Sequence, residues 1–198
     1  SNGNVWTVSY SYYYLTKWTL NAAKTQWSCS SYTNYNYPTY LTGVDFDEDT
    51  GKLFVSYYDS STYPTYNRYL MEVNPSNPSS ISSTWSLGSA VDYNYKTTST
   101  AGNPNSGLVV DLPRIILNEY NQQGSRHHHF SMNGFSLEKM GVQEMPNGGH
   151  YGLSQDDESG KVLFACYYTS YCSSVARKIH MWGDGALFDE RTPTTTST

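Results

Sequence analysis

Charged side chains are scarce in this 198-residue chain, at 15% of the sequence, and no long apolar run occurs. Lysine and arginine total 12 against 17 acids, which gives a net charge of −5, and they form no basic run. Nucleic acids and anionic membrane surfaces are bound by basic faces, so the sequence predicts neither as a partner. A membrane-spanning helix needs about 20 predominantly apolar residues. We therefore expect no membrane insertion.

Short motifs that identify a reaction are also missing. The sequence has no Gly-x-Ser-x-Gly elbow, no phosphate-binding loop and no zinc-like cysteine spacing. Two acidic clusters, at 47–49 and 156–158, could hold calcium through carboxylate oxygens, but they match no EF-hand loop. Turn formation with a solvated tip is the favoured interpretation. We predict no catalytic residue, no metal ligand and no cofactor, with calcium as the alternative.

Cysteine is rare, with three residues in all. Cys166 and Cys172 flank one loop, where a hairpin would bring its two ends together, and a disulfide between them is predicted. On the loop-entropy model it would add about 2 kcal/mol. Such a bond would imply an oxidising compartment. Cys29 is then left over, either buried or paired with a partner.

The strongest positive signal is an internal repeat. Residues 43–74 recur without a gap 109 positions later, at 152–183. Each copy has a short alternating strand, an acidic turn closed by Thr-Gly-Lys or Ser-Gly-Lys, and two more strands. Gly51 is suited to the positive φ that such a hairpin loop needs. The repeat therefore predicts antiparallel meanders.

Two weaker copies fill the remaining sequence, at 5–28 and 114–141. Four meanders of about fifty residues predict an all-β, four-bladed β-propeller-like array. We expect one domain over 1–191, with approximate blades at 1–38, 39–90, 91–145 and 146–191. The first blade is expected to be incomplete, with three strands or with a strand lent by another chain. Residues 192–198 are predicted to be a Thr/Pro-rich tail or the start of a linker, with Thr194, Thr195 and Thr196 as candidates for O-glycosylation.

With these repeats placed, the chain resembles β-propellers of the NHL or SMP-30-like general type, in which an acidic turn and a strand recur once per blade. DEDTGKLFVS at 47–56 and DDESGKVLFA at 156–165 carry the resemblance. It implies a propeller fold. The metal-binding acids of SMP-30-like lactonases have no counterpart that can be placed here, so the resemblance transfers no catalytic residue.

The run His127, His128 and His129 is the most suggestive group of metal-ligand residue types. On a strand, the first and third would share one face about 7 Å apart. Neighbours on one strand do not by themselves converge on a metal. The favoured interpretation is half-exposed histidines on an edge or interface strand.

Tyrosine is abundant, with 20 residues beside 5 tryptophans, and Ser, Thr and Asn supply most of the polar positions. A neutral, hydroxyl-rich, aromatic surface favours a secreted or cell-surface structural module that assembles into a homo-oligomer or polymer, such as a surface filament or matrix. One alternative is a lectin that binds glycans with loop Tyr and Trp rings. Another is a metal-dependent hydrolase or lactonase of propeller fold. The tyrosines predicted to form an interaction surface are Tyr12, Tyr13, Tyr35, Tyr37, Tyr63, Tyr66 and Tyr171.

Overall fold

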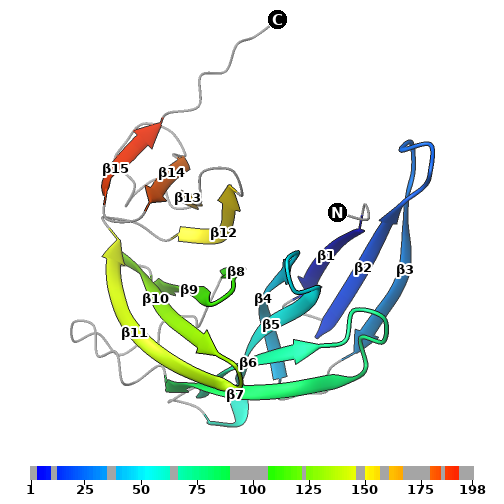
Figure 1. Cartoon of the computed structure of the whole chain (residues 1–198), viewed down its shortest axis with the longest axis horizontal. Coiled ribbons are helices and arrows are strands. Elements are labelled where there is room, and N and C mark those ends of the chain that lie inside the picture. The colour runs from blue at the N-terminus through cyan, green and yellow to red at the C-terminus, as the bar shows by residue number, and fades with distance from the viewer. Residues whose placement is uncertain are drawn as a thin grey trace, which may run out of the picture. The chain divides into compact units, whose positions relative to one another are not determined.

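The fold is all-β in the described part of the chain. The computed structural model describes residues 4–9, 13–34, 39–62, 67–89, 107–121, 124–145, 150–156, 161–166, 179–183 and 186–191 (Figure 1). Within these ranges the regular elements are fifteen strands and one 3-10 turn, η1 (Ser60–Thr62). None of these residues forms a helix with the length and apolarity needed to span a bilayer. The chain divides into two compact units, 1–104 with 110–112, and 105–109 with 113–198.

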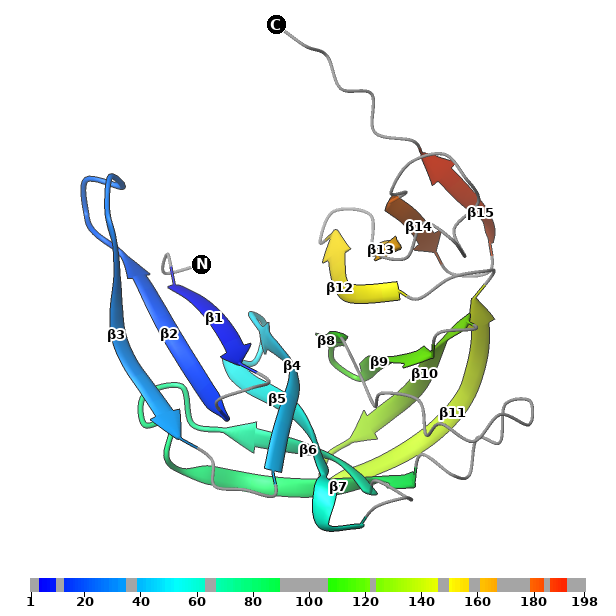
Figure 2. The same cartoon turned by 180° about the vertical axis from the view of Figure 1, so that it is seen from behind.

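The first unit holds two antiparallel meanders in which each strand pairs with the next along the chain. The three-stranded first sheet contains β1 (Asn4–Ser9), β2 (Tyr14–Leu20) and β3 (Trp27–Asn34), in that order. The four-stranded second sheet contains β4 (Thr39–Asp47), β5 (Lys52–Asp59), β6 (Asn67–Val73) and β7 (Ile81–Ser89), also in chain order. Figures 1 and 2 both show β1 beside β4 and β3 as the strand of the first sheet farthest from β4.

The remaining strands form two further four-stranded meanders. The third sheet contains β8 (Gly107–Asp111), β9 (Arg114–Asn121), β10 (Gly124–Asn133) and β11 (Ser136–Met145). The fourth contains β12 (His150–Asp156), β13 (Lys161–Cys166), β14 (Ile179–Gly183) and β15 (Ala186–Arg191). The two strong copies of the repeat therefore occupy equivalent places, since each supplies the first three strands of a four-stranded sheet.

The acidic turn of the first strong copy is built as its sequence predicts. Gly51 has φ 69° and its amide donates to the Asp47 carbonyl at 2.9 Å. The Thr50 amide donates to Asp47 Oδ2 at 3.0 Å, and the Thr50 hydroxyl donates to the same oxygen. Glu48 and Asp49 are exposed, whereas Asp47 is buried. The first acid thus holds the turn together, and only the next two form its solvated tip.

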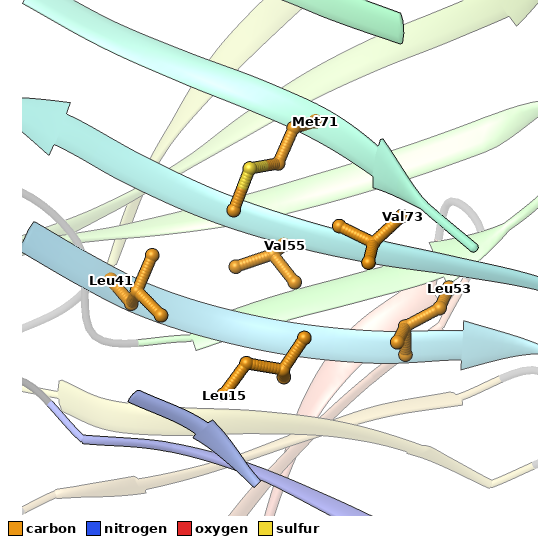
Figure 3. Packing of buried hydrophobic residues seen from close by; sticks show 6 residues of the cluster. All are labelled: Leu15, Leu41, Leu53, Val55, Met71 and Val73. Atoms are coloured by element: carbon orange, nitrogen blue, oxygen red, sulfur yellow. The ribbon is translucent and has the colours of Figure 1, made fainter. Parts of the chain in front are cut away.

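The core of the first unit lies between its two sheets. Leu41, Leu53, Val55, Met71 and Val73 come from one face of the second sheet, and Leu15 from β2 points towards them (Figure 3). These residues are at most 1% exposed. The other face of β5 is also buried, because Phe54 and Ser56 are fully inaccessible. The second sheet is therefore buried on both sides in its middle.

Tyr57 continues the core face of β5 and stacks on Tyr69, with ring centroids 5.0 Å apart and planes 18° from parallel. Burial raises the pKa of Tyr57 above its ordinary value of 10.0, and Tyr69 and Asp59 add to the rise. The folded state thus holds this proton more tightly than the unfolded chain does.

Stability is therefore expected to fall in alkali as the pH passes the unfolded pKa of about 10 and approaches the higher folded value. The Tyr57→Phe variant cannot ionise there and should lose less stability. Urea unfolding of both proteins between about pH 9 and pH 11 measures this difference. Parallel pH profiles for the two proteins would contradict the prediction.

The histidine run is placed differently from the sequence expectation. β10 lies between β9 and β11 in the third sheet, so it is an interior strand. His127 and His128 point to opposite faces of β10 and are both fully buried, while His129 is half-buried. The expectation of half-exposed histidines on an edge or interface strand was therefore wrong for His127 and His128. We therefore interpret His127 and His128 as part of the packed interior around the third sheet.

Strand positions otherwise follow the sequence pattern closely. The expectation of a short first meander agrees with the three strands found in the first sheet. β3 extends beyond residue 28, where the first weak copy was expected to end, and β8 was not predicted. That 1–191 forms one domain stays a prediction, and residues 192–198, with the three candidate threonines, lie outside the described residues.

Candidate interaction surface

The first sheet has one face in the core and one in solvent. Trp6 and Val8 on β1 pack against the core, and Leu15 on β2 belongs to it. Successive side chains of a strand point to opposite faces, so the residues between them point away from the core. Val5 is accordingly 45% exposed and Thr7 is exposed.

Strand register gathers the exposed apolar residues of this sheet on its outward face. Val5 is opposite Trp18, and Trp18 is opposite Cys29, across all three strands. Leu20 is opposite Trp27, one step further along the same face. Trp18 is 37% exposed, Trp27 is 47% exposed, and Cys29 is exposed. We call these five residues the Trp18 face.

A hydrogen bond fixes the position of the central ring. Trp18 Nε1 donates to Thr7 Oγ1 at 3.0 Å, so the indole reaches across from β2 to β1. The polar group of the ring is thereby satisfied within the sheet. The part of the ring that a partner can still contact is apolar surface. Aromatic surface of this kind dominates the energetics of interfaces.

The Trp18 face is electrically neutral. Lys17 is the one charged residue in the sequences of β1, β2 and β3. Its Nζ lies 5.5 Å from the ring centroid of Trp6, on the core side of the sheet. A partner that covers the Trp18 face would therefore have no charge to desolvate there.

The loop between β2 and β3 holds this surface in register. The Asn21 amide donates to the Gln26 carbonyl at 2.9 Å, and the Asn21 side-chain oxygen accepts from the Thr25 amide at 2.8 Å. Lys24 adopts φ 56° to close the turn. Local side-chain bonds of this kind explain why the six residues at 21–26 connect two strands without a glycine.

The predicted tyrosine surface is described at one position. Tyr13 has φ 57°, is half-buried, and packs edge-on against Tyr40, with ring centroids 4.8 Å apart. Tyr40 in turn stacks on Tyr58 at 5.0 Å. Tyr13 therefore contributes to an internal aromatic cluster of the first unit. The other six lie outside the described residues, and their part in an interaction surface stays a prediction: Tyr12, Tyr35, Tyr37, Tyr63, Tyr66 and Tyr171.

Two acids of β4 bind main-chain amides. Asp45 Oδ2 accepts from the Val110 amide at 2.7 Å, and Asp47 Oδ1 accepts from the Leu112 amide at 3.5 Å. Asp45 and Asp47 are two residues apart on β4, and the amides they bind, those of Val110 and Leu112, are also two residues apart. In the described part of the chain, no group of three His, Cys, Asp or Glu side chains could hold a metal ion. The role that the geometry gives Asp45 and Asp47 is therefore structural, since both carboxylates bind main-chain amides.

The remaining candidates come later in the sequence. Cys166 ends β13, whereas Cys172 lies outside the described residues, so the predicted disulfide stays a prediction. Asp111 at the end of β8 is half-buried. Phe135, in the turn between β10 and β11, and Met140, at the register shift of β11, are 86% and 64% exposed.

Sequence reasoning missed the Trp18 face because it looked for rings in loops. The signal was available in the alternation of the first two predicted strands, where apolar residues stand at both odd and even positions. Such a pattern means that one set must be exposed if the strand lies at the surface. Which set is exposed depends on the register, which the sequence does not give.

No protein-family model matches the sequence, and neither does any curated protein. Among solved structures, the chain is similar to an exo-β-1,3-galactanase from Phanerochaete chrysosporium, solved with β-1,3-galactotriose. The identity is 9% and the TM-score is 0.46, over 96% of this chain and 49% of that chain. The chain thus spans about half the length of this solved structure. A likeness at this level supports no inference about chemistry.

Proposed function

We propose that this protein is a non-catalytic module of the cell surface or extracellular space that associates with copies of itself. In this proposal its four meanders are blades of a propeller-like array, and the Trp18 face is the contact surface. The observation that carries it is the gathering of Val5, Trp18 and Trp27 on one exposed, neutral face.

The physical support is the chemistry of that face. Contiguous exposed apolar residues mark interaction sites more often than single ones do. Tryptophan is among the residues most enriched at the energetic centres of protein interfaces. Because Trp18 is held by Thr7, little side-chain entropy is left to lose when a partner covers the ring. Both features favour a preformed contact surface.

Sedimentation velocity over a dilution series tests the proposal. The wild type is expected to associate as its concentration rises, and the double variant Trp18→Thr, Trp27→Thr to remain monomeric. Threonine keeps strand propensity, so the sheet is retained while the apolar area is removed. Phe135→Thr is the matched control, because it removes an exposed ring elsewhere and should associate like the wild type. A wild type that is monomeric at every concentration would refute self-association.

A second candidate function is carbohydrate binding by the same face. The observation in its favour is the indole of Trp18 held beside the Thr7 hydroxyl, because sugars present an apolar face to a ring and hydroxyls to its neighbours. Quenching or enhancement of tryptophan fluorescence on addition of oligosaccharides, absent in the double variant, would support it. A silent glycan array would remove it.

A further inference from the structure

We infer that β3 is the assembly edge of this protein and pairs antiparallel with β3 of a second copy. The inference rests on the proposed self-association and adds a second contact between copies, along a strand edge, that acts together with the Trp18 face. It starts from the sheet order, in which β3, β7, β11 and β15 each lie at the end of a sheet. Among the described strands, β3 is hydrogen-bonded to β2 alone. The opposite end of the first sheet is β1, which lies against β4.

The last strands of the four sheets in chain order, β3, β7, β11 and β15, differ in charge. Exposed strand edges are templates for pairing, and natural proteins protect them with charged residues, proline or bulges. β11 contains Glu138, Lys139 and Glu144, and β15 contains three consecutive charged residues at 189–191. The sequences of β3 and β7 contain neither a charged residue nor a proline. Two edges therefore lack protection by charge or proline.

The two neutral edge strands, β3 and β7, differ in their number of β-bulges. The register between β6 and β7 shifts twice, at Arg68/Tyr69 and at Glu72/Val73. Each bulge bends and twists the strand that carries it, which works against a straight new ladder. The register between β2 and β3 shifts once, at Lys17/Trp18. β3 therefore carries one bulge, at Ser30, and β7 carries two.

Exposure points to the same strand. Trp27, Ser28 and Cys29 are consecutive and all exposed, so β3 is open to solvent on both of its faces over this stretch. A strand that is exposed on both faces over this stretch, and that pairs with a single strand among the described ones, leaves room for a neighbouring chain. The side chains of an added strand would therefore not clash with Trp27, Ser28 or Cys29.

The occupant is a second copy because of symmetry and charge. A two-fold axis perpendicular to the sheet makes the two β3 strands antiparallel. Each residue of one β3 then lies opposite a residue of the other copy's β3. Like charges that face each other across strands are destabilising. A neutral strand can meet itself in any register without this cost, whereas the charges on β11 and β15 restrict the registers that are open to them.

The pairing would also extend the proposed contact surface. Strands related in this way keep their equivalent faces on the same side, because directly opposed residues point the same way in a sheet. Two three-stranded sheets then become one six-stranded sheet, with Trp18 and Trp27 of both copies on one side. Cys29 lies on that same side, so two copies of it would come within about 5–8 Å if they are opposite or diagonal.

A charge placed on the edge tests the inference. Ser28→Lys puts on β3 the residue that natural edges use for protection, and Ser82→Lys puts the same charge on the other neutral edge, β7. Both positions are exposed, so neither change should affect folding, which urea unfolding checks. In sedimentation velocity, Ser28→Lys is expected to raise the dissociation constant of self-association roughly tenfold or more. Ser82→Lys is expected to leave it unchanged.

Cross-linking through Cys29 gives a second readout. A short bis-maleimide is expected to yield covalent dimers of the wild type and of Ser82→Lys, but few of Ser28→Lys and none through this position in Cys29→Ser. A wild type that stays monomeric overturns the proposed function together with this inference. A wild type that associates overturns the inference alone if Ser28→Lys associates as strongly as the wild type.

Discussion

Replacing Leu15 with alanine is expected to lower the free energy of unfolding by about 2–5 kcal/mol. Leu15 is fully buried and comes from the first sheet, while the other five members of its core cluster come from the second. Its removal leaves a cavity at the place where the two sheets of the first unit meet. Urea unfolding followed by tryptophan fluorescence measures the loss as a shift of the midpoint.

Two control variants separate packing from chain chemistry. Leu15→Met keeps the buried volume and should cost less than about 1.5 kcal/mol. Val5→Ala shortens an exposed residue on the other face of the same sheet and is expected to stay within about 0.5 kcal/mol of the wild type. A loss from Leu15→Ala no larger than that from Val5→Ala would show that the first sheet does not depend on this core.

Replacing Asp45 with alanine is expected to cost about 1–3 kcal/mol. The carboxylate accepts the Val110 amide at 2.7 Å, and the truncated side chain would leave that amide without this acceptor. Val110 is 6% exposed, so water is a poor substitute. Hydrogen exchange of the Val110 amide should become faster in the variant, which reports on this bond directly.

Asparagine and a neighbouring acid provide the comparison. Asp45→Asn retains an acceptor oxygen and should lose less stability than Asp45→Ala. Asp49→Ala removes an exposed acid from the nearby turn and is expected to change stability little. Equal losses in Asp45→Ala and Asp49→Ala would mean that the effect is one of net charge, not of the bond to Val110.

The Leu15 prediction bears on the proposed contact surface. The Trp18 face is presented by a sheet whose reverse side is anchored through Leu15, Trp6 and Val8. A contact surface needs rigid support if its rings are to be covered without a large loss of entropy. A variant that loosens Leu15 should therefore weaken self-association as well as lower stability, whereas the Trp18 and Trp27 changes affect association alone.

Much of the strand order could be predicted because this fold is local. Strands pair with their neighbours along the chain, and the acidic turn at Asp47 carries its own signal in Thr50 and Gly51. Repetition of that signal at 156–161 then places a second meander. Information of this kind is contained in short segments, so a single sequence is enough to find it.

Other features depend on tertiary packing. β8 was missed because Gly107–Asp111 is a short, continuously buried apolar run, which has no alternation to mark it as a strand. The histidines were misplaced because the sequence does not show which polar residues of a strand are buried by packing on the faces of the sheet. The Trp18 face needed the register between three strands, and register is fixed by packing as much as by turns.

The burial of His127 and His128 has a practical consequence. Three consecutive histidines look like a natural handle for immobilised nickel, but two of these imidazoles are inaccessible in the folded sheet and the third is half-covered. Through this run, the resin would preferentially capture chains in which the third sheet has opened. Purification on the native histidines would therefore enrich damaged molecules and leave intact ones in the flow-through.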